Sequence, residues 1–531
     1  MGEIYAHVPI NIHPHVAMTM VQRKWNLRGL YFLDTWPMSK VRQLVIIDPV
    51  SNTFHIVIHI IRPNLVVDGS RSSLTLYQDL AVQVTQTNSR PKSPAIQQFI
   101  GHIVGPKSLL FTEGEQWKKI RSLFNPGFSL AHLMTLVPSI VDDTMIFCEV
   151  LAEHANSGEV RPIETAAAHL TIDIMGHIVL DIDLNSQREE NELVEAFRNQ
   201  ISWTPGNTTL NPFEGFNPLR PFMHKYYESK MNNYLERVLD DRYATSATRD
   251  TIKSRRKPAI DLALDEYSHQ QDDNVIKSTK GIDKAFKSLA IDQMKSFLFA
   301  GHDTSSSTVS YAYHLLNLHP DKLAKARAEL DQVFGKNTDG VQTGNLIKQN
   351  PNLLNSVPYI LSVIKETLRL YTPALTVRQG QGTIVYEGVT YDTEGFQVLV
   401  LSLGMHRNAD YFPSPDDFIP ERFMPAPDNF QEIPKDVYRP FEKGPRDCIG
   451  QQLAILEMKI ILAMTLRDFD IKADYETWDK RLGREKPGNI LDGRRGMFGK
   501  QITRASLSEY NLTLSFRRSC LSASDSQRKA A

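Results

Sequence analysis

Cysteine is scarce in this sequence, since only Cys148, Cys448 and Cys520 occur among 531 residues. Three cysteines cannot build a disulfide framework, and their spacing gives neither a C-x-x-C redox pair nor a zinc knuckle. Disulfide-rich secreted folds and zinc fingers are therefore excluded, and a reducing compartment is the default. A lone cysteine in a large protein is usually a small buried apolar residue, so its neighbours decide whether it has another role.

An excess of one charge and long apolar runs are also missing. Lysine and arginine total 60 against 61 acidic residues, which excludes a nucleic-acid partner bound through a basic surface. The most apolar early stretch, Leu44 to Val67, is interrupted by Asp48 and Arg62, whereas a membrane span needs about 20 predominantly apolar residues. Met1 to Asn26 mixes histidine, proline and charge, which predicts no signal peptide.

Glycine and proline are modest at 28 and 29 residues, while 41% of the chain is hydrophobic and 23% charged. This composition excludes collagen-like, low-complexity and disordered classes, and no repeat indicates a solenoid or propeller. From about Gln116 onward the pattern is mostly helical, which predicts a mainly α protein with small β-sheets, of the α+β class. The strand-like runs are Thr53–Ile61, Gly382–Tyr391 with a turn at Gly388, Phe396–Leu403 and Tyr510–Phe516.

One helix is expected to be unusually long. No proline occurs between Pro258 and Pro320, and apolar residues recur there at helical intervals. The pattern predicts a helix from Asp283 to Asn317, about 50 Å long. Its middle carries Ala300-Gly301-His302-Asp303-Thr304, where a core helix would be apolar, and this inconsistency marks a candidate site.

The most specific motif is Phe441-Glu442-Lys443-Gly444-Pro445-Arg446-Asp447-Cys448-Ile449-Gly450, followed by an amphipathic run. Its cysteine precedes a helix N-terminus, where backbone N–H groups and the helix dipole favour a thiolate. An anionic sulfur there is a metal ligand or a nucleophile. A nucleophile would need a histidine base, which the sequence leaves open, whereas Arg446 and the flanking glycines favour a flat anionic cofactor.

At every fixed position this motif resembles F-x-x-G-x-R-x-C-x-G, the haem-ligand signature of the cytochrome P-450 superfamily of haem-thiolate monooxygenases. The resemblance implies the P-450 fold, with a long central helix over haem b. It implies that Cys448 is the axial thiolate ligand of the haem iron, with Phe441 packed beside it and Arg446 on a haem propionate. Gly444 and Gly450 would let the backbone approach the ring.

A second motif is Lys365-Glu366-Thr367-Leu368-Arg369, which places Glu366 and Arg369 on one helical face. Alone, such a pair is usually a solvated surface ion pair. Together with Pro420-Glu421-Arg422-Phe423 it resembles the E-x-x-R helix and P-E-R-F element of the family. The resemblance implies that Arg422 joins the pair in a buried structural network, in which losing one member would leave a buried charge unpaired.

Trp117 and Arg121 are four residues apart, so they share a helix face and could donate to one carboxylate. They resemble the W-x-x-x-R motif of the family, which binds a haem propionate. By the same resemblance Arg378 and His406 are further propionate contacts.

The segment from Ala300 to Thr304 resembles the [AG]-G-x-[DE]-T oxygen-activation segment of the family. Gly301 would leave room for O2, and Thr304 could bond a helix carbonyl and admit water. Asp303 and Thr304 are then the catalytic residues that carry protons to the reacting oxygen. The alternative is a capping or solvent-exposed polar cluster, and His302 is expected to face outward rather than to bind metal.

The resemblance implies that O2 is a co-substrate and that electrons come from NADPH through a separate flavoprotein reductase, with cytochrome b5 as a further candidate partner. No G-x-G-x-x-G follows a strand, so no nicotinamide-binding fold is fused to the chain. Lys118, Lys119, Lys443 and Arg121 are candidates for the reductase docking face; the alternative is that they are merely solvated.

A lipophilic small-molecule substrate is expected because three segments implied to line the pocket contain aromatic residues. These are Phe99–Phe111, Ile201–Tyr227 with Trp203, Phe213, Phe216 and Phe222, and Phe297–Thr304. Ser108–Glu115 and Gly301–Ser306 look most like filamentous-fungal members that tailor secondary metabolites. The alternatives are a fatty-acid hydroxylase, an oxygen-independent isomerase or dehydratase, against which Asp303 and Thr304 argue, and a haem sensor or inactive relative.

The expected organisation is an atypical N-terminal segment over residues 1–42, one haem domain over 43–516 and a flexible polar tail over 517–531. The family implies an intracellular enzyme at the endoplasmic reticulum surface. No anchoring helix is recognisable near the N-terminus, and Gly483 to Ala505 shows no obvious closing hairpin.

Overall fold

The structure is a computed structural model of the 531-residue chain. It describes residues 29–34, 42–47, 80–87, 89–204, 217–246, 258–261, 264–265, 282–386, 388–424, 432–474, 477, 480, 490–491, 494–495 and 513–518. The expected strand at Thr53–Ile61, the segment Met1–Asn26, and the aromatic residues Phe213 and Phe216 lie outside these residues.

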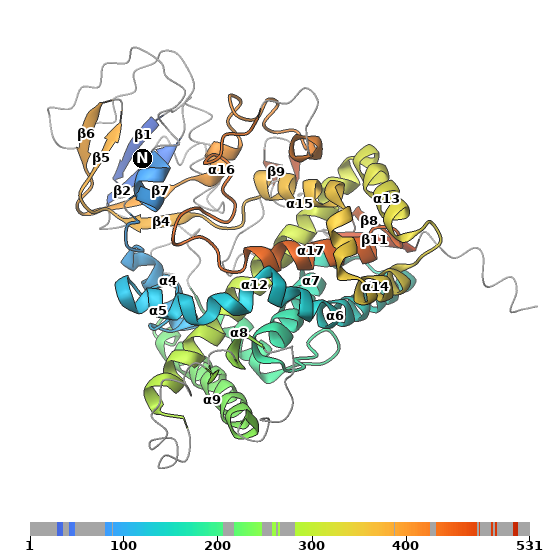
Figure 1. Ribbon diagram of the computed structural model, residues 1–531, viewed down its shortest axis with the longest axis horizontal. Helices are drawn as coiled ribbons and strands as arrows, with labels where there is room; N and C mark the ends of the chain where they lie inside the picture. Colours follow the sequence, from blue (N-terminus) through green and yellow to red (C-terminus); the bar gives the residue numbers. More distant parts are fainter. Residues whose placement is uncertain are drawn as a thin grey trace, which may run out of the picture.

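Helices form most of the described chain, as predicted (Figure 1). The α-helices are α4 (Pro94–Val104), α5 (Gly114–Phe124), α6 (Leu130–Ser157), α7 (Ile163–Met175), α8 (Glu192–Ser202), α9 (Arg220–Ser246), α12 (Lys284–Leu318), α13 (Pro320–Phe334), α14 (Gly340–Gln349), α15 (Pro358–Leu370), α16 (Ser402–His406) and α17 (Gln451–Thr465). Shorter 3-10 and π turns are η1 (Gln83–Thr87), η2 (Asn125–Phe128), η3 (Gly176–Leu180), η5 (Pro351–Ser356) and η6 (Pro420–Phe423).

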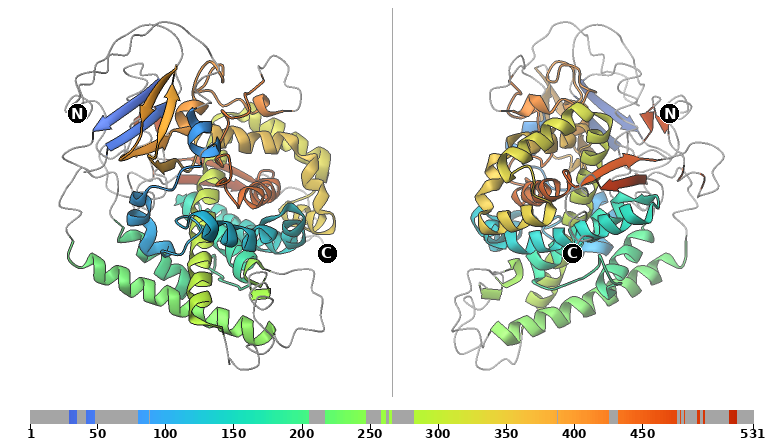
Figure 2. Two further views of the ribbon diagram at one scale, coloured as in Figure 1. Left: turned by 60° about the vertical axis from the view of Figure 1, so that its left-hand side comes forward. Right: turned by 90° about the vertical axis from the view of Figure 1, so that its right-hand side faces the viewer.

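The long helix α12 confirms the predicted segment to within one residue at each end. Asp283 caps it by accepting hydrogen bonds from the amides of Ala285 and Phe286 at 2.8 and 3.0 Å. The next helix begins at Pro320, a residue that suits a first helical turn. Figure 2 shows α12 as a yellow-green column through the middle of the helical body.

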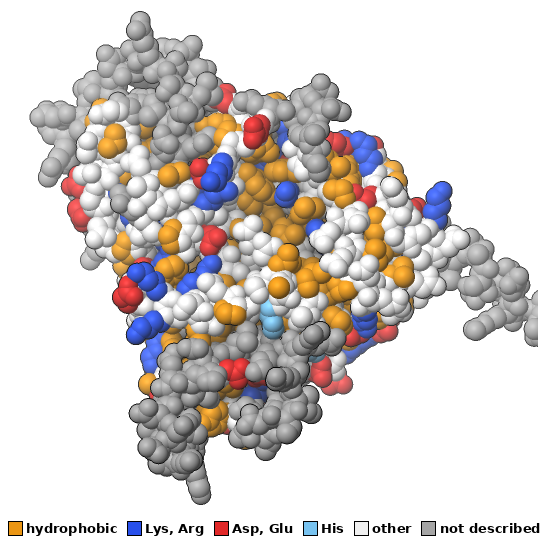
Figure 3. All heavy atoms as spheres, in the orientation of Figure 1, with side chains coloured by type: hydrophobic (Ala, Val, Ile, Leu, Met, Phe, Trp, Pro, Cys, Tyr) orange, Lys and Arg blue, Asp and Glu red, His pale blue; other side chains and the backbone are white. Residues whose placement is uncertain are grey.

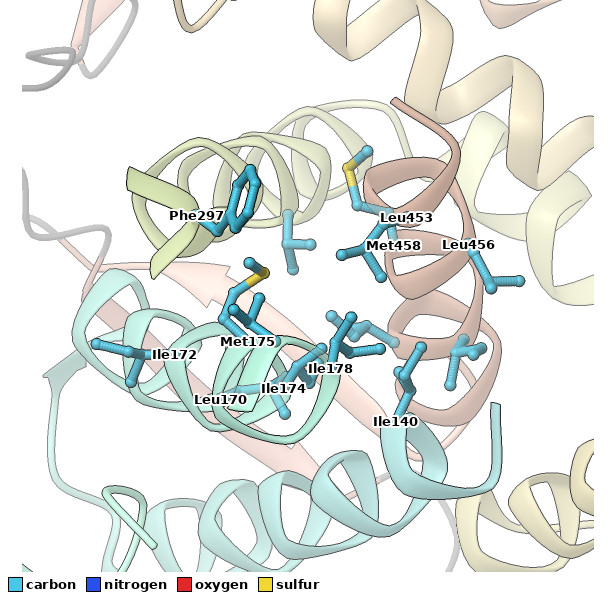
Figure 4. Close-up of a cluster of buried hydrophobic side chains, with 14 of the residues drawn as sticks. Ile140, Leu170, Ile172, Ile174, Met175, Ile178, Phe297, Leu453, Leu456 and Met458 are labelled. Carbon is cyan, nitrogen blue, oxygen red and sulfur yellow. The ribbon is translucent and has the colours of Figure 1, made fainter. Parts of the chain in front are cut away.

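The main core surrounds this column. Side chains from α6, α7, α12 and α17 meet in one apolar cluster, in which Ile140, Leu170, Met175, Phe297 and Leu453 are buried (Figure 4). One described segment, Ile163–Leu180, is long and apolar enough to cross a membrane, but 72% of it is buried inside the fold. It therefore serves here as a core segment.

Small sheets lie at the edge of the helical body, and their strands are β1 (Gly29–Asp34), β2 (Arg42–Ile47), β3 (Arg161–Pro162), β4 (Thr376–Gln379), β5 (Thr383–Tyr386), β6 (Val389–Asp392), β7 (Phe396–Val400), β8 (Phe469–Ala473), β9 (Ile490–Leu491), β10 (Arg494–Arg495) and β11 (Thr513–Arg518). The largest has the order β1-β2-β7-β4, in which β2 and β7 are parallel with Arg42 opposite Phe396. β5 and β6 form a hairpin around Gly388, as predicted, where φ is 76°.

One expectation for the C-terminal part needs correction. β9 and β10 pair in an antiparallel hairpin, so Gly483 to Ala505 does contain one. The residues between these strands are Asp492-Gly493, a common two-residue hairpin sequence that the longer basic stretch obscures. The last described strand, β11, runs from Thr513 to Arg518 and pairs with both β3 and β8. It contains Thr513 to Phe516 of the expected strand and extends two residues beyond it, while residues 510–512 lie outside the described part of the chain.

Candidate active site

Cys448 lies in a tight loop directly before α17. Its amide donates to the Phe441 carbonyl at 2.9 Å, and the Asp447 amide donates to the Gly444 carbonyl at 3.1 Å. Gly450 is the residue that caps α17. The fold therefore presents the thiol at the N-terminus of a 15-residue helix, where unpaired N–H groups stabilise negative charge.

The two described cysteines differ in their surroundings. Cys448 is exposed, but the protein around it raises the pKa of its thiol by desolvation, while the Gly450 N–H and Arg121 act in the opposite direction. Cys148 is buried in the core, 3.8 Å from the Met464 carbonyl, and burial raises the pKa of its thiol strongly. Cys148 thus behaves as a small apolar residue, and only Cys448 is presented for chemistry.

The two glycines of the cysteine loop lie in different surroundings. Gly444 has φ at 93°, and a Cβ there would lie 2.3 Å from the Thr85 carbonyl oxygen. Glycine is therefore required here for packing against η1 and for the positive φ, whatever its part beside the ring. A Cβ at Gly450 would have Cys448 Sγ at 3.9 Å as its nearest neighbour, which is an ordinary contact.

Buried cations gather beside this loop. Arg378 on β4 is fully buried, and its Nη1 donates to the Arg90 carbonyl at 3.1 Å. Its Nε and Nη2 have no hydrogen-bond partner among the described residues. Burial lowers the pKa of Arg378 to about 10. Lys92 pairs with Arg378 in an isolated β-bridge. Burial, followed by repulsion from Arg378, lowers the pKa of its ammonium to about 7.

Trp117 and Arg121 both lie on α5, as predicted, but they are engaged by different partners. The Arg446 guanidinium stacks on the Trp117 ring with 4.6 Å between its central carbon and the ring centroid. Arg121 donates to the Asp447 carbonyl and to its carboxylate, both at 2.8 Å, and to Asn125. Arg121 is therefore tied to the cysteine loop itself rather than left free for a shared carboxylate.

His406 is brought close to the site but offers no free nitrogen. Its Nε2 accepts a hydrogen bond from the Arg439 amide at 2.9 Å, which leaves the proton on Nδ1, 2.9 Å from Thr372 Oγ1. The geometry therefore does not support His406 as a propionate contact. Arg439 was missed by sequence reasoning: it is buried, and it bonds Glu442 at 2.6 Å and Thr85 at 2.7 Å.

The central turn of α12 supplies the hydroxyl expected there. Thr304 Oγ1 donates to the Ala300 carbonyl at 2.7 Å, as predicted. Asp303 is half-buried, and desolvation raises the pKa of its carboxyl. Glu164 on α7 is a like-charged neighbour, and its own pKa is raised well above the usual range by burial and by Asp303. A carboxyl that holds its proton more tightly than usual is suited to giving it up during a reaction.

Two residues of this turn pack against neighbouring helices. A Cβ at Gly301 would lie 2.4 Å from Met175 Sδ, so the glycine also allows α7 to pack against α12. Figure 4 shows Met175 pointing from α7 toward α12. His302 is half-buried with its ring 5.7 Å from that of Phe197, so it does not face outward.

The profile of the cytochrome P450 family matches residues 66–489 of this chain. The chain is 37% identical over 519 residues to the cytochrome P450 monooxygenase acrF of Aspergillus aculeatus, covering 94% of this chain and 95% of that one.

The chain belongs to the cytochrome P450 family. It is also 32% identical over 510 residues to the cytochrome P450 monooxygenase polC of Polytolypa hystricis, covering 95% of this chain and 84% of the relative. The crystal structure of a cytochrome P450, CYP102L1, resembles its fold with a TM-score of 0.68 at 20% identity, covering 96% and 99% of the two chains. The protein is therefore a cytochrome P450 monooxygenase.

The P450 core contains the expected charge network in full. Arg369 forms a two-pronged ion pair with Glu366 on α15, both bonds measuring 2.7 Å, and both side chains are wholly buried. Arg422 on η6 approaches the same carboxylate at 3.4 Å. The remaining Arg369 donors bind the carbonyls of His406, Pro415 and Asp417. This network joins α15 to the chain that precedes the cysteine loop.

The residues of this P450 fit a haem. Two buried donors of Arg378 lack a protein acceptor, and a desolvated donor without an acceptor is costly unless an anion supplies one. The pKa of Lys92 stays low although Glu442 and Glu113 act to raise it, and a haem propionate would add further negative charge there. Sequence reasoning missed Lys92, because a single lysine before Ser93-Pro94 carries no motif; only its isolated β-bridge to Arg378 reveals its place.

The expected aromatic lining is only partly supported. Phe297 is buried between Phe124 and Phe128, with ring centroids 5.1 and 5.0 Å away, and so belongs to the core. Phe222 is 73% exposed on α9 and lines nothing in the described structure. Trp203 is half-buried at the end of α8.

Proposed function

We propose that this P450 monooxygenase uses haem b and electrons delivered from NADPH by a flavoprotein reductase, with cytochrome b5 as an additional donor. Its substrate is a lipophilic small molecule of fungal secondary metabolism, which it hydroxylates, epoxidises or otherwise oxidises. The observation that carries the proposal is the Cys448 thiol at the N-terminus of α17, together with unpartnered buried donors on Arg378.

Each site residue has a definite task under this proposal. Arg378 and Lys92 bind the propionates, and Cys448 ligates the iron. When bound in this way, haem supplies a redox-active iron whose thiolate ligand promotes O–O cleavage. Thr304 holds a proton on Oγ1 beside the Ala300 carbonyl, and Asp303 replaces that proton from a carboxyl whose pKa is raised by burial.

The reductase would dock on the side of the cysteine loop and α5. Lys118 is largely exposed there, paired at 2.6 Å with Glu115, and Lys119 is adjacent. Figure 3 shows lysine and arginine side chains along the edge of the molecule over α5. An acidic partner can use such a local patch although the whole chain is nearly neutral.

We further propose that the enzyme works at the endoplasmic reticulum surface. Leu219, Phe222 and Tyr226, at and just before the start of α9, are 61%, 73% and 52% exposed, and their spacing places them on one face. Exposed apolar side chains gathered on one face favour contact with a lipid surface. Subcellular fractionation of the full chain would test this location.

The haem-thiolate assignment is tested by the spectrum of the reduced, CO-bound protein. The wild type should show the strongly red-shifted Soret band typical of thiolate ligation, and Cys448→Ala should lose it while Cys148→Ala keeps it. A folded, haem-loaded wild type without the band would refute thiolate ligation.

Substrate class is tested by turnover with a reductase and NADPH. We expect oxidation of polycyclic intermediates of fungal pathways rather than of a fatty-acid panel. Turnover of fatty acids alone would favour a fatty-acid hydroxylase, and turnover without O2 would favour an isomerase or dehydratase.

A further inference from the structure

The strongest feature that the proposed function does not use is a buried polar cluster on α12, two turns before the oxygen-activating segment. Gln293 and Ser296 are almost wholly inaccessible, at 0% and 3% exposure, on a helix that packs through the core. Buried amides and hydroxyls are costly unless they are hydrogen-bonded. Their partners therefore indicate what the cluster does.

Both side chains bind the segment 105–112, which connects α4 to α5. Gln293 Oε1 accepts from the Leu109 amide at 2.8 Å, and Gln293 Nε2 donates to the Lys107 carbonyl at 2.6 Å. Ser296 Oγ lies 2.7 Å from Ser108 Oγ. The glutamine amide thus pairs with the main chain as a neighbouring β-strand would, and it can do so in only one orientation.

Asp292 strengthens this attachment. Its carboxylate accepts from the Lys107 amide at 3.0 Å, and a Cβ at Gly105, where φ is 84°, would lie 1.9 Å from Asp292 Oδ1. Only glycine allows this approach. Lys295, fully buried, lies 3.1 Å from the same carboxylate and 4.0 Å from Glu228 of α9.

The same segment is held from the opposite side by the cysteine loop. Arg446 Nη1 donates to the Leu109 carbonyl at 3.3 Å, and Nη2 donates to the Thr112 carbonyl at 2.6 Å. The N–H of Leu109 therefore bonds to Gln293 of α12, and its C=O accepts from Arg446 of the cysteine loop. The segment spans from the helix that bears Thr304 to the loop that bears Cys448.

We propose that Gln293 and Ser296 are positioning residues, which fix segment 105–112 as one wall of the substrate pocket at a set distance from the oxygen-activating turn. The proposal rests on the proposed function and on the expectation that Phe99–Phe111 lines the substrate pocket. Ser296 precedes Ala300 by about one helical turn, so the wall and the turn move as one body. Size selectivity for a ligand of the iron is then set by these hydrogen bonds.

The test compares Ser296→Ala with Ser310→Ala in the haem-loaded full chain. Both serines are buried on α12 and donate to the carbonyl four residues earlier, but among the described residues only Ser296 also meets segment 105–112. Gln293→Leu removes both bonds of the amide to segment 105–112. Gln293→Glu keeps the acceptor alone, which covers the case in which Gln293→Leu does not fold.

Two measurements are needed, hydrogen exchange and azole binding. For Ser296→Ala and the Gln293 variants we expect amides 107–109 to exchange at least tenfold faster. We also expect 4-phenylimidazole to gain at least fivefold in affinity over imidazole, read from the Soret shift, because the released wall can yield to the larger ligand. Ser310→Ala should match the wild type in both.

Faster exchange with an unchanged azole ratio would overturn the positioning role, because a merely structural bond would behave in that way. Unchanged exchange in all variants would overturn the attachment itself. Failure of the haem assignment is distinguishable, since the wild type would then give no Soret shift with either azole, and failure of the substrate assignment appears only in the turnover experiment.

Discussion

At the scale of single residues, the candidate site contains ionisable groups that the fold removes from water. Arg378 and Lys92 are cations depressed in pKa by burial, and Asp303 is a carboxyl raised in pKa by burial. Such opposed shifts are typical of sites where charge will develop or be bound. Each pKa shift makes the ionisation of the residue sensitive to a bound ligand or to pH.

Thr304 provides the sharpest test of proton delivery. Thr304→Ala removes the hydroxyl that donates to the Ala300 carbonyl, and it should leave the CO spectrum intact. Product formed per NADPH consumed should fall by about 10²-fold, the lower end of what a general acid–base group typically contributes. Ser307→Ala, which loses a hydroxyl bonded to the Thr304 carbonyl, is the control. Unchanged coupling in Thr304→Ala would remove Thr304 from the proton route.

Glu457 on α17 gives a prediction for stability against pH. The side chain is buried and hydrogen-bonded by Ser305 of α12, and desolvation raises the pKa of its carboxyl to about 8. The unfolded chain releases this proton near the usual value of about 4.3, so the folded state binds more protons between there and about 8. Stability contributed by this group is therefore full at low pH and falls as pH rises through that window.

Glu457→Gln should remove this slope. Relative to wild type, the variant should gain about 1–3 kcal/mol in the free energy of unfolding between pH 5.5 and pH 8. Denaturant unfolding of the haem-loaded protein at the two pH values measures it. A constant difference between the two proteins would show that Glu457 is ionised in the folded state.

At the scale of elements, the contact between α7 and α12 determines where the catalytic turn lies. Gly301 has no side chain because Met175 occupies the position that a Cβ would take. In the same place Thr171 Oγ1 on α7 donates to the His302 carbonyl at 2.7 Å. Packing between these two helices is therefore one requirement for glycine at this position.

Gly301→Ala should therefore destabilise the fold by about 1–3 kcal/mol through overpacking. In the Met175→Ala background, Gly301→Ala should cost much less stability than it does in the wild type. The shortened side chain at position 175 leaves room for the added methyl group. Thermal unfolding of the four proteins in this cycle measures the coupling. Additive effects would mean that the two residues do not compete.

Much at this scale was predictable from the sequence. The proline-free apolar stretch predicted α12, and Gly388 predicted the turn between β5 and β6, because local patterns specify such elements. The role of Gly301 was not predictable, since it depends on Met175, a residue far away in the sequence. Lys92 and Arg439 escaped for the same reason: their environment arises only when distant segments fold together.

At the scale of the whole molecule, a nearly neutral chain carries an uneven surface. Lys118 and Lys119 lie together on α5, whose Arg121 binds the cysteine loop. Under the proposed function, a reductase that docks on the side of that loop would meet these lysines. Charge complementarity in such encounters acts mainly on the rate of association.

Lys118→Glu with Lys119→Glu should slow reduction by an acidic flavoprotein reductase about tenfold at low salt. The difference from wild type should shrink as salt rises, because exposed charges are screened. Stopped-flow reduction under CO measures the rate, and Lys325→Glu on α13 is the control on a different helix. Equal rates at low salt would place the docking face elsewhere.

The parallel pairing of β2 with β7 has a consequence for synthesis in the cell. Arg42 lies opposite Phe396, so the partner of the second strand is made roughly 350 residues later. At about 5–20 residues per second, translation takes on the order of 20–70 s to supply it. Throughout that time β2 has an unpaired edge, which is prone to misassociation. Chaperone supply during translation should therefore limit the yield of this enzyme more than its final stability does.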